Sequence, residues 1–511
     1  MKKQAVIGVD IGTTGCRAAI HRPDGRLLAS QAREYPLLTP RPEWAEQDPD
    51  IIYQKFCEVV SAAVSQAGLA PEEVAGLSFS AVFHSFLAVD RDGEALCPLL
   101  TWADNRSQQA AERLKKTVDG TAVYRRTGCP LHPMYPLAKI AWLAAERPDL
   151  FRRAAKFVSI KEYIVHRLTG RFAVDRSIAS GTGLYNFNTL EWDEELLAVL
   201  GIGAERLSAV HSPAAVLPGI RPEAAAALGI SPATPLVLGA GDGAMASLGS
   251  GVVRPGLMAA TVGTSGAVRM LSPRPLTDEQ GRTWCYNLND DYWMVGAAIN
   301  NGGIALRWVR DEIAECASRE AAATGADAYD LLSGYARAVP AGSEGLIALP
   351  LFTGERAPYW NADARGILFG LTLTHTKRHI VRAILEGVVY RMYSIFAALE
   401  SVAGPAEEVR ASGSFTRSPL WVQIMADTFG RPVKVPGEPE GAAFGASAFG
   451  MVALGLLPDL AAIGQLGAVR EVFRPDAANT ARYSELYGIF TRVYRNLQKE
   501  FSDIASIQRG T

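Results

Sequence analysis

Signatures for binding metals through cysteine, or for binding nucleic acid, are absent from this chain. Its six cysteines stand far apart, without C-x-x-C pairs or nearby histidines that would make a metal site. The net charge is −2, and acidic and basic residues are spread along the whole length. No basic field exists to attract nucleic acid or an anionic membrane. We expect small-molecule partners or further copies of the chain, and cysteines that stay reduced in the core.

Long apolar runs are also missing. Residues 1–3 resemble the start of a signal peptide, but only residues 5–9 are apolar before Asp10 intervenes. The longest apolar stretch, residues 442–457, is broken by glycines and is shorter than the ~20 residues that a membrane span needs. We predict a cytoplasmic protein in which this stretch forms a buried helix.

The two commonest nucleotide-binding motifs do not account for the chain. The G-x-x-x-x-G-K-[ST] loop occurs nowhere. Gly239, Gly241 and Ala244 fit a loose G-x-G-x-x-A pattern, but residues 253–270 contain no acidic residue to contact a ribose. A nicotinamide-dependent dehydrogenase is therefore disfavoured, and any phosphate must be held by other turns.

One turn motif is present twice, as residues 9–15 (VDIGTTG) and residues 260–266 (ATVGTSG). Each copy lies between two apolar runs, which predicts a β-hairpin. Glycine lets the main chain approach a phosphate closely, and the hydroxyl side chains add neutral donors. Asp10 in the first copy is matched by Thr261 in the second, so only the first offers a carboxylate to a metal ion. The motif favours a duplicated fold that closes on a magnesium nucleotide over two ordinary turns.

Helical and strand patterns alternate on both sides of the middle. Residues 52–64 and 483–501 are apolar at helical spacing, and residues 77–82 and 236–241 have the composition of buried strands. This alternation favours α/β layers. The chain of 511 residues exceeds one core, and the duplicated motif predicts two domains, residues 1–243 and 244–511, hinged near residue 243.

Two longer segments carry a resemblance to a known family. Residues 366–371 and 379–386, separated by seven residues, fit the second signature of the FGGY carbohydrate kinases throughout. The first signature is met by Met134, Pro136, Lys139, Ile140, Trp142 and Leu143, although Ala145 stands where a polar residue is usual. The resemblance runs nearly end to end. It implies two ribonuclease-H-like domains of the actin/hexokinase superfamily with a ligand cleft between them.

The resemblance also implies roles for individual residues. Asp242 matches the general base, although by local sequence it could equally cap the following helix. Asp10 matches the residue that holds Mg²⁺, and ATP is the implied phosphoryl donor. The residues implied to contact phosphate or nucleotide are Thr13, Thr14, Arg17, Gly263, Thr264, Ser265, Gly302, Gly303, Gly413 and Ser414.

The implied sugar site lies in residues 80–85 and 101–106, with His84, Asp104 and Arg106 as contacts. These segments are more similar to the gluconate-phosphorylating members of the family than to those acting on xylulose or glycerol. Gly243 stands where the latter two carry a side-chain amide beside the base. Gluconate has a carboxylate, for which Arg106, Arg126 and His132 are candidate partners.

The sequence therefore predicts an ATP- and Mg²⁺-dependent enzyme that phosphorylates the 6-hydroxyl of D-gluconate, with Asp242 as the base. Two alternatives stay open. One is a kinase of the same family for another polyol or ketose such as xylulose. The other is a non-catalytic ATP-binding module of the actin-like superfamily. A homodimer is a further expectation from family habit.

Overall fold

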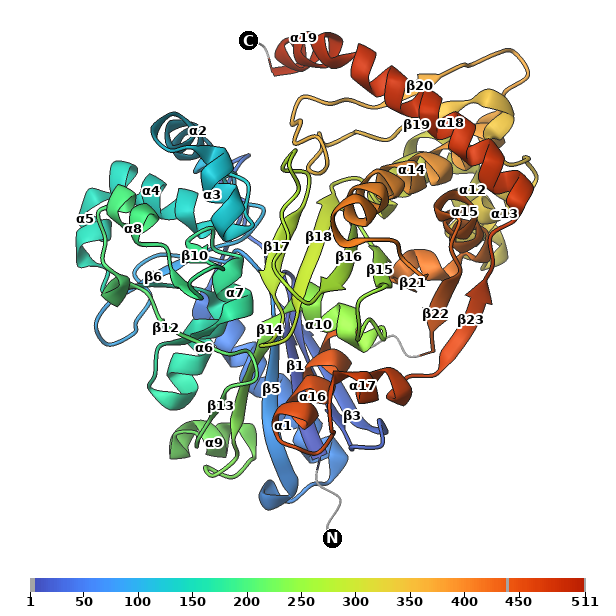
Figure 1. The fold of residues 1–511 in the computed structure, drawn as a ribbon. Helices are drawn as coiled ribbons and strands as arrows, with labels where there is room; N and C mark the ends of the chain where they lie inside the picture. The colour runs from blue at the N-terminus through green and yellow to red at the C-terminus, as the bar shows by residue number, and fades with distance from the viewer. Residues whose placement is uncertain (1–4, 438–440, 510–511) are drawn as a thin grey trace.

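The computed structural model describes residues 5–437 and 441–509. The segment compared with a signal peptide, residues 1–3, lies outside these ranges. In the described ranges, no helix combines the length and the apolar character that crossing a membrane requires. The two ends of the described chain lie at opposite ends of the molecule (Figure 1).

A six-stranded mixed sheet forms the frame of the first half, in the order β13-β14-β5-β1-β2-β3. Its strands are β1 (Ala5–Ile11), β2 (Gly15–His21), β3 (Leu27–Glu34), β5 (Val74–Ala81), β13 (Val216–Leu217) and β14 (Leu236–Gly241). The pair β1–β2 is antiparallel, which confirms the first predicted hairpin, whereas β5 runs parallel to both β1 and β14. The strands are largely buried because both faces of the sheet are covered.

A seven-stranded sheet in the second half repeats this arrangement, in the order β17-β18-β16-β15-β21-β22-β23. Its strands are β15 (Leu257–Val262), β16 (Gly266–Ser272), β17 (Trp284–Asn287), β18 (Trp293–Ile299), β21 (Glu408–Ser412), β22 (Val433–Pro436) and β23 (Val469–Phe473). Again an antiparallel hairpin, β15–β16, is followed by parallel strands, β21 and β22. The predicted duplicated α/β fold is confirmed.

Helices and short strands complete both halves. The first half contains β4 (Glu46–Gln47), β6 (Leu87–Val89), β7 (Leu99–Leu100), β8 (Lys156–Val158), β9 (Ala173–Asp175), β10 (Tyr185–Asn186), β11 (Glu191–Trp192), β12 (Ala209–His211), α1 (Pro49–Ala67), α2 (Gln108–Thr117), α3 (Gly120–Thr127), α4 (Pro136–Glu146), α5 (Pro148–Arg153), α6 (Ile160–Thr169), α7 (Arg176–Ser180), α8 (Glu194–Leu200) and α9 (Pro222–Leu228). The second half contains β19 (Ile347–Leu349), β20 (Ile367–Phe369), α10 (Asp242–Gly249), α11 (Gly303–Trp308), α12 (Glu315–Thr324), α13 (Ala328–Arg337), α14 (Lys377–Ala403), α15 (Pro419–Phe429), α16 (Gly441–Ala453), α17 (Leu460–Leu466), α18 (Ala477–Asn496) and α19 (Gln498–Arg509). Short 3₁₀ or π turns are η1 (Pro71–Glu73), η2 (Ala204–Arg206), η3 (Val309–Ile313), η4 (Ser343–Gly345) and η5 (Ser414–Arg417).

Helix α1 shows how local sequence sets these elements. Asp48 caps it by accepting hydrogen bonds from the Asp50 and Ile51 amides, and proline occupies the first position. Gly68 ends it in the left-handed region, at φ 62°. The buried face predicted within residues 52–64 packs against β2 and β3.

Helix α16 comes from the second half of the sequence but packs on the first sheet. It contacts β1, β2 and β5, and its buried surface confirms the helix predicted in residues 442–457 (Figure 1). A Cβ atom on Gly8 of β1 would lie 2.1 Å from the Ala443 carbonyl oxygen, so the helix touches the strand backbone. The predicted domain boundary at residue 243 stays a prediction. Helix α16 follows that boundary in sequence but packs on the sheet that precedes it.

Helices α10 and α16 cross at backbone contact. A Cβ atom on Gly249 would lie 1.9 Å from the Gly441 carbonyl oxygen, and one on Gly445 would lie 1.9 Å from the Met245 carbonyl oxygen. Two helices can approach this closely only where side chains are absent on both. The crossing therefore fixes the start of α10, where Asp242 lies, relative to the first sheet.

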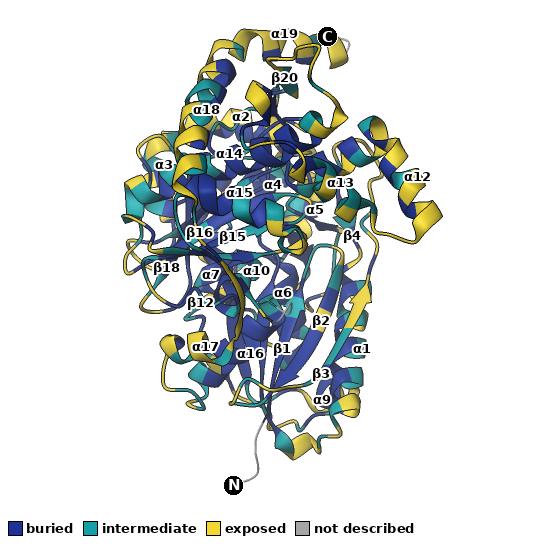
Figure 2. Cartoon of the chain, turned by 90° about the vertical axis from the view of Figure 1, so that its right-hand side faces the viewer, coloured by how far each residue is buried: buried dark blue, intermediate teal, exposed yellow. Residues whose placement is uncertain are grey.

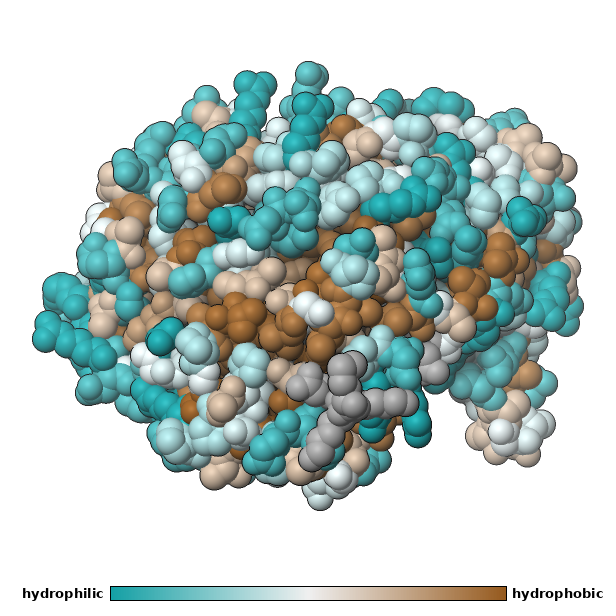
Figure 3. Space-filling view, turned by 60° about the horizontal axis from the view of Figure 1, so that its bottom comes forward, coloured by the Kyte–Doolittle hydropathy of each residue, from teal (hydrophilic) through white to brown (hydrophobic). Residues whose placement is uncertain are grey.

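Two sequence expectations need correction. The apolar pattern of residues 483–501 predicts one helix, but α18 ends at Asn496 and α19 begins at Gln498, because Leu497 has a non-helical backbone. Cys316 is exposed rather than in the core, and Cys57 and Cys97 are half-buried. The exposed surface lies mainly on the outer helices, including α12 and α19 (Figure 2). Seen from below, the surface has an apolar band between hydrophilic margins (Figure 3).

The helix crossing generates a test with a matched control in the same helix. Gly445→Ala should lower the free energy of unfolding by about 3 kcal/mol, because the new methyl group pushes the α10 backbone away. Gly441→Ala meets only atoms at 3.9 Å and should be neutral or stabilising by up to about 1 kcal/mol. Urea denaturation of the three proteins measures both changes. Equal stability of the two variants would contradict the backbone contact.

Candidate functional site

Two carboxylates emerge at the same edge of the first sheet. Asp10 lies near the end of β1, and Asp242 directly follows β14, with β5 paired between them. Burial, together with the charge of Asp242, raises the pKa of Asp10 from its ordinary 3.8 to about 7. Burial also raises the pKa of Asp242, against the opposing charge of Arg269. The pair forms a concentrated acidic centre.

The Asp242 carboxylate is held by the amide of the next residue, and Asp242 does not occupy the cap position of its helix. Gly241 occupies the cap position of α10, and Asp242 is the first helical residue. Its Oδ1 accepts a hydrogen bond from the Gly243 amide at 2.6 Å. Of the two sequence interpretations, capping fails, and the carboxylate remains available for chemistry.

The duplication extends to side-chain contacts at both hairpins. Asp10 accepts a hydrogen bond of 2.7 Å from Ser80 on the paired strand β5. The matching Thr261 shares one of 2.8 Å with Ser412 on β21, at the same register position. A carboxylate thus stands in one half where a hydroxyl stands in the other.

The first hairpin tip presents hydroxyl groups between the two halves. Its turn is closed by a 2.9 Å hydrogen bond from the Gly12 amide to the Gly15 carbonyl. Thr13 accepts a hydrogen bond from the Trp102 indole at 2.9 Å, and Thr14 is exposed. Arg17 lies opposite Asp10 in the hairpin, and its charge opposes the rise in the pKa of Asp10.

The second hairpin tip borders a cavity of about 600 Å³. The start of α11 packs against this tip, with hydrogen bonds from Gly302 to the Thr264 carbonyl and from Gly303 to the Gly263 carbonyl. Predicted nucleotide residues that line the cavity are Gly263, Thr264, Gly303 and Ser414; they are joined by Leu306, Arg307, Tyr329, Ser333 and Trp421.

Ser265 belongs to the tip itself, whereas Gly302 and Gly413, the other predicted nucleotide residues of the second half, pack against the hairpin backbone. A Cβ atom on Gly302 would lie 2.4 Å from the Ser265 carbonyl oxygen. One on Gly413, whose φ is 98°, would lie 2.4 Å from the Val262 carbonyl oxygen. These glycines let the hairpin backbone pack closely, which sequence alone does not distinguish from making room for a ligand.

His84 lies in a strained loop after β5. Its φ is 63°, and its Nδ1 lies 2.6 Å from the Gly181 carbonyl oxygen. Burial lowers the pKa of its ring from 6.5 to about 3, so the ring is neutral. Because a carbonyl only accepts, Nδ1 carries the proton and Nε2 remains an acceptor. Lys139 ties this loop to the next by donating to the His84 and Thr101 carbonyls, each at 2.7 Å.

Asp104 and Arg106 bind each other. Asp104 is fully buried and accepts hydrogen bonds from the Arg106 guanidinium and the Ala45 amide. Arg106 also pairs with Glu46 at 2.7 Å, and its guanidinium carbon lies 3.6 Å from the centre of the Trp44 ring. This closed cluster shapes the loop, and both partners' charges are already compensated.

The other two candidate partners for the gluconate carboxylate, Arg126 and His132, do not offer a free positive charge either. Arg126 pairs with Asp193 at 2.7 Å and with Glu195 at 2.9 Å. Burial lowers the pKa of His132 to about 3, with the charge of Arg356 adding to the effect, so the ring carries no positive charge. His132 instead lies against Trp360, with ring centres 5.5 Å apart.

Sequence reasoning missed Arg269 on β16 and Arg356 in the segment between β19 and β20. A Cβ atom on Gly243 would lie 2.7 Å from the Arg269 Nε, so this guanidinium fills the space that a side chain beside the base would need. Arg356 lies over the Trp102 ring at 5.3 Å. The absent side chain at Gly243 was the available signal, but its meaning depends on a contact with a distant strand.

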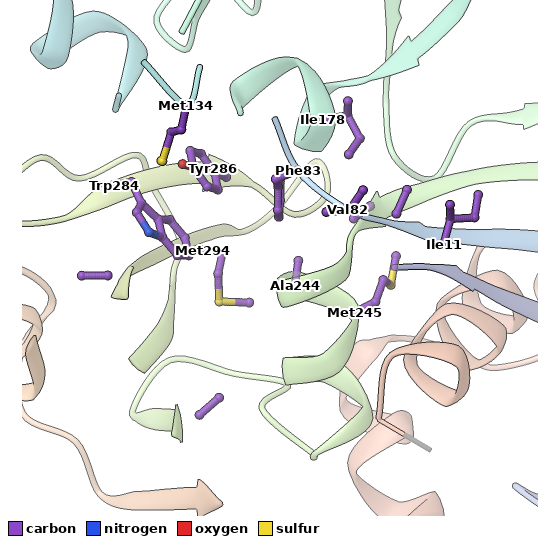
Figure 4. Packing of buried hydrophobic residues seen from close by; sticks show 14 of the residues in the cluster. Ile11, Val82, Phe83, Met134, Ile178, Ala244, Met245, Trp284, Tyr286 and Met294 are labelled. Carbon is purple, nitrogen blue, oxygen red and sulfur yellow. The ribbon is translucent and has the colours of Figure 1, made fainter. Parts of the chain in front are cut away.

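An apolar layer lies beside these polar groups. Phe83 and Tyr286 pack with ring centres 4.8 Å apart, and Trp284 stacks on Tyr286 at 4.3 Å (Figure 4). The Tyr286 hydroxyl meets that of Tyr135 at 3.1 Å. Since Tyr286 and Trp284 belong to the second sheet and Phe83 to the first half, this layer joins the halves next to the carboxylates.

Two sequence models of one family match the chain. The N-terminal domain of the FGGY family of carbohydrate kinases matches residues 5–249, and the C-terminal domain of the same family matches residues 258–454. The gluconokinase of Bacillus subtilis (strain 168) is 41% identical over 507 residues, which cover 99% of this chain and 98% of that protein.

Solved structures share the whole fold. A gluconate kinase from Lactobacillus acidophilus matches with a TM-score of 0.92 and 32% identity, over 98% of this chain and 99% of that one. A ligand-bound xylulose kinase from the same organism matches with a TM-score of 0.92 and 33% identity, over 98% of this chain and 100% of that one.

The neutral His84 ring gives a pH-dependent prediction. A histidine with a pKa of 6.5 when unfolded and about 3 when folded stabilises the fold least in acid, because the unfolded chain takes up the proton first. His84→Asn keeps a donor for the Gly181 carbonyl and suits the positive φ. Between pH 7.5 and pH 5, the variant should gain about 2 kcal/mol of unfolding free energy relative to the parent protein. The unfolding free energies of both proteins are measured by urea denaturation at each pH. If they change equally over this range, the His84 ring is not held neutral.

Proposed function

The chain belongs to the FGGY family of carbohydrate kinases, and on this basis we propose that it transfers the γ-phosphoryl group of ATP to the 6-hydroxyl of D-gluconate. The product is 6-phosphogluconate. The observation that carries the chemistry is the placement of Asp242 at the edge of the first sheet, at the start of α10, where the charge of Arg269 from the second sheet acts on it. The full-length identity of 41% to a gluconokinase supports the choice of substrate.

Asp242 is the proposed general base. Phosphoryl transfer needs little covalent help from the protein, and the attacking hydroxyl must lose its proton to a nearby group. Burial makes the carboxylate more basic, while the Gly243 amide and the charge of Arg269 favour its ionised form. A carboxylate that is ionised, yet more basic than in water, accepts the proton as the bond to phosphorus forms.

Asp10 is the proposed magnesium contact. Its Oδ1 is occupied by Ser80, but two buried carboxylates raise each other's energy, and a cation relieves that cost. Mg²⁺ typically keeps several waters and binds through one or two carboxylates plus substrate phosphates, and Asp10 beside the hairpin tip fits that requirement. When bound, the ion neutralises charge on the phosphates.

The two hairpin tips are the proposed phosphate clamp. Thr13, Thr14 and Arg17 serve from the first half, while Gly263, Thr264 and Ser265 serve from the second. Gly303 and Ser414 line the cavity for the nucleoside, with Gly302 and Gly413 supporting its wall. Backbone amides and hydroxyls suit phosphate oxygens because they donate without adding charge that slows release.

His84 is the proposed hydroxyl contact of the sugar acid, accepting through Nε2 while Nδ1 is fixed on Gly181. Asp104 and Arg106 contribute by shaping the loop that carries Trp102. This assigns them a supporting role, whereas the sequence predicts direct contact.

Xylulose is the second candidate substrate. It is supported by the ligand-bound xylulose kinase, whose backbone matches this chain as well as that of the gluconate kinase does. Gluconate is favoured by the closer sequence relative and by Gly243, which leaves room for Arg269 where an amide would otherwise stand.

The decisive measurement is ADP release by purified protein with Mg-ATP, comparing D-gluconate with D-xylulose, L-ribulose, glycerol and no sugar. Turnover should be confined to gluconate. Asp242→Asn should lower kcat by a factor of about 10³ or more without weakening gluconate binding. Asp48→Asn makes the same chemical change at a remote helix cap and should leave kcat unchanged. Turnover with another acceptor would identify that acceptor as the substrate in place of gluconate. No turnover with any acceptor would favour the non-catalytic ATP-binding module.

Asp10→Asn tests the metal assignment separately. The variant should need at least about tenfold more Mg²⁺ for half-maximal rate, because the ion loses a charged contact. Ser80→Ala removes only the hydrogen bond to Asp10 and should shift the requirement far less. The magnesium dependence of initial rates measures both, and an unchanged dependence in Asp10→Asn would exclude Asp10 as a metal contact.

A further inference from the structure

A sugar acid brings a carboxylate into the site, and the cations that sequence singled out are already paired. Arg106 is neutralised by Asp104 and Glu46, and Arg126 by Asp193 and Glu195. His132 carries no charge near neutral pH. A carboxylate leaving water needs a positive partner, so another group must supply it.

Arg356 has the features of that partner. Its Nε is buried and has no hydrogen-bond partner among the described residues, and its Nη2 makes one long bond of 3.3 Å to the Ile299 carbonyl. The neighbouring Glu355 is bound to Arg391 at 3.2 Å and to the Asn300 amide at 2.8 Å. The guanidinium thus lacks an ion-pair partner within the described chain.

Arg269 is a second incompletely satisfied guanidinium in the same region. Its side chain makes no hydrogen bond or ion pair to the described residues, and its Nε is buried. Burial lowers its pKa, and the charge of Arg356 lowers it further, while the charge of Asp242 opposes both. Arg356 has no ion-pair partner among the described residues, and Arg269 has only the nearby charge of Asp242, so an anionic ligand offsets part of the cost of burying both guanidinium groups.

Contacts with the second sheet give the positions of these groups. Arg269 lies next to the base, because a Cβ atom on Gly243 would lie 2.7 Å from its Nε. On the neighbouring strand β18, Gly296 pairs with Arg269, and Ile299, further along that strand, accepts the hydrogen bond from Arg356. Arg356 is thus displaced along β18 from Arg269, and it lies over the Trp102 ring.

We propose that Arg356 binds the carboxylate of the acceptor and that Arg269 contacts its middle hydroxyls. The proposal rests on the proposed function, because it requires the 6-hydroxyl to lie at Asp242. The carboxylate is at the opposite end of the six-carbon chain from that hydroxyl, and Arg356 lies further along β18 than Arg269, which is beside the base. Arg356 lies over the Trp102 ring at 5.3 Å, and its buried Nε has no partner among the described residues, so this N–H is available for a bidentate contact with the carboxylate.

The test compares D-gluconate with D-gluconamide, which has the same skeleton and hydroxyl groups but no charge. Dissociation constants are measured by calorimetry for the parent protein and for Arg356→Gln, and turnover of gluconate is measured alongside. The parent protein should bind gluconate about 10- to 100-fold more tightly than gluconamide, and the variant should bind both about equally. Arg356→Lys, which keeps the charge but loses the planar fork, should recover part of the preference.

Two controls separate the outcomes. Arg365→Gln removes a half-buried arginine that bonds to Gln508, and it should change the affinity for neither ligand. ADP binding should be unchanged in Arg356→Gln, because Arg356 is not among the residues that line the nucleotide cavity; this shows that the variant is folded. Equal loss of both ligands, or a preference that survives in Arg356→Gln, would overturn the inference alone. A parent protein that does not turn over gluconate would overturn the proposed function, and the inference with it.

Discussion

The backbone crossing of α10 and α16 is the constraint on which the rest of the structure depends. Gly249 and Gly445 allow the helices to touch through their main chains. One of these helices begins at Asp242, and the other lies on β1, whose end carries Asp10. The crossing therefore sets the spacing of the two carboxylates from outside the site, without using a side chain that ligand binding could displace.

The two halves use the same frame for different purposes. Asp10 with Ser80 and Thr261 with Ser412 occupy equivalent register positions, so the duplicated sheet presents one acidic and one neutral group to the proposed phosphate clamp. Under the proposed phosphate clamp, a second carboxylate in place of Thr261 would repel the phosphates. The asymmetry between the copies is thus as informative as their likeness.

Local sequence predicted the elements that depend on short-range rules. Both hairpins, the capped helix α1 and the buried helix α16 follow from turn residues and apolar spacing. The break at Leu497 escaped because the apolar spacing continues across it. The state of Arg106 escaped because one of its partners, Glu46, comes from a separate strand. Arg269 and Arg356 were missed because their positions depend on Gly243 and Trp102, which are distant in sequence.

Substrate choice and phosphate chemistry are carried by different parts of the molecule. The carboxylates and hairpin tips come from strand ends in paired sheets, where register leaves little freedom. Arg356 and His84 come from connecting segments, and Gly243 acts only by leaving space for Arg269. A change of acceptor within this fold therefore needs new charges on loops around an unchanged phosphate clamp. The match of a gluconate kinase and a xylulose kinase from one organism to this backbone, with the same TM-score of 0.92, agrees with such a separation of fold from acceptor choice.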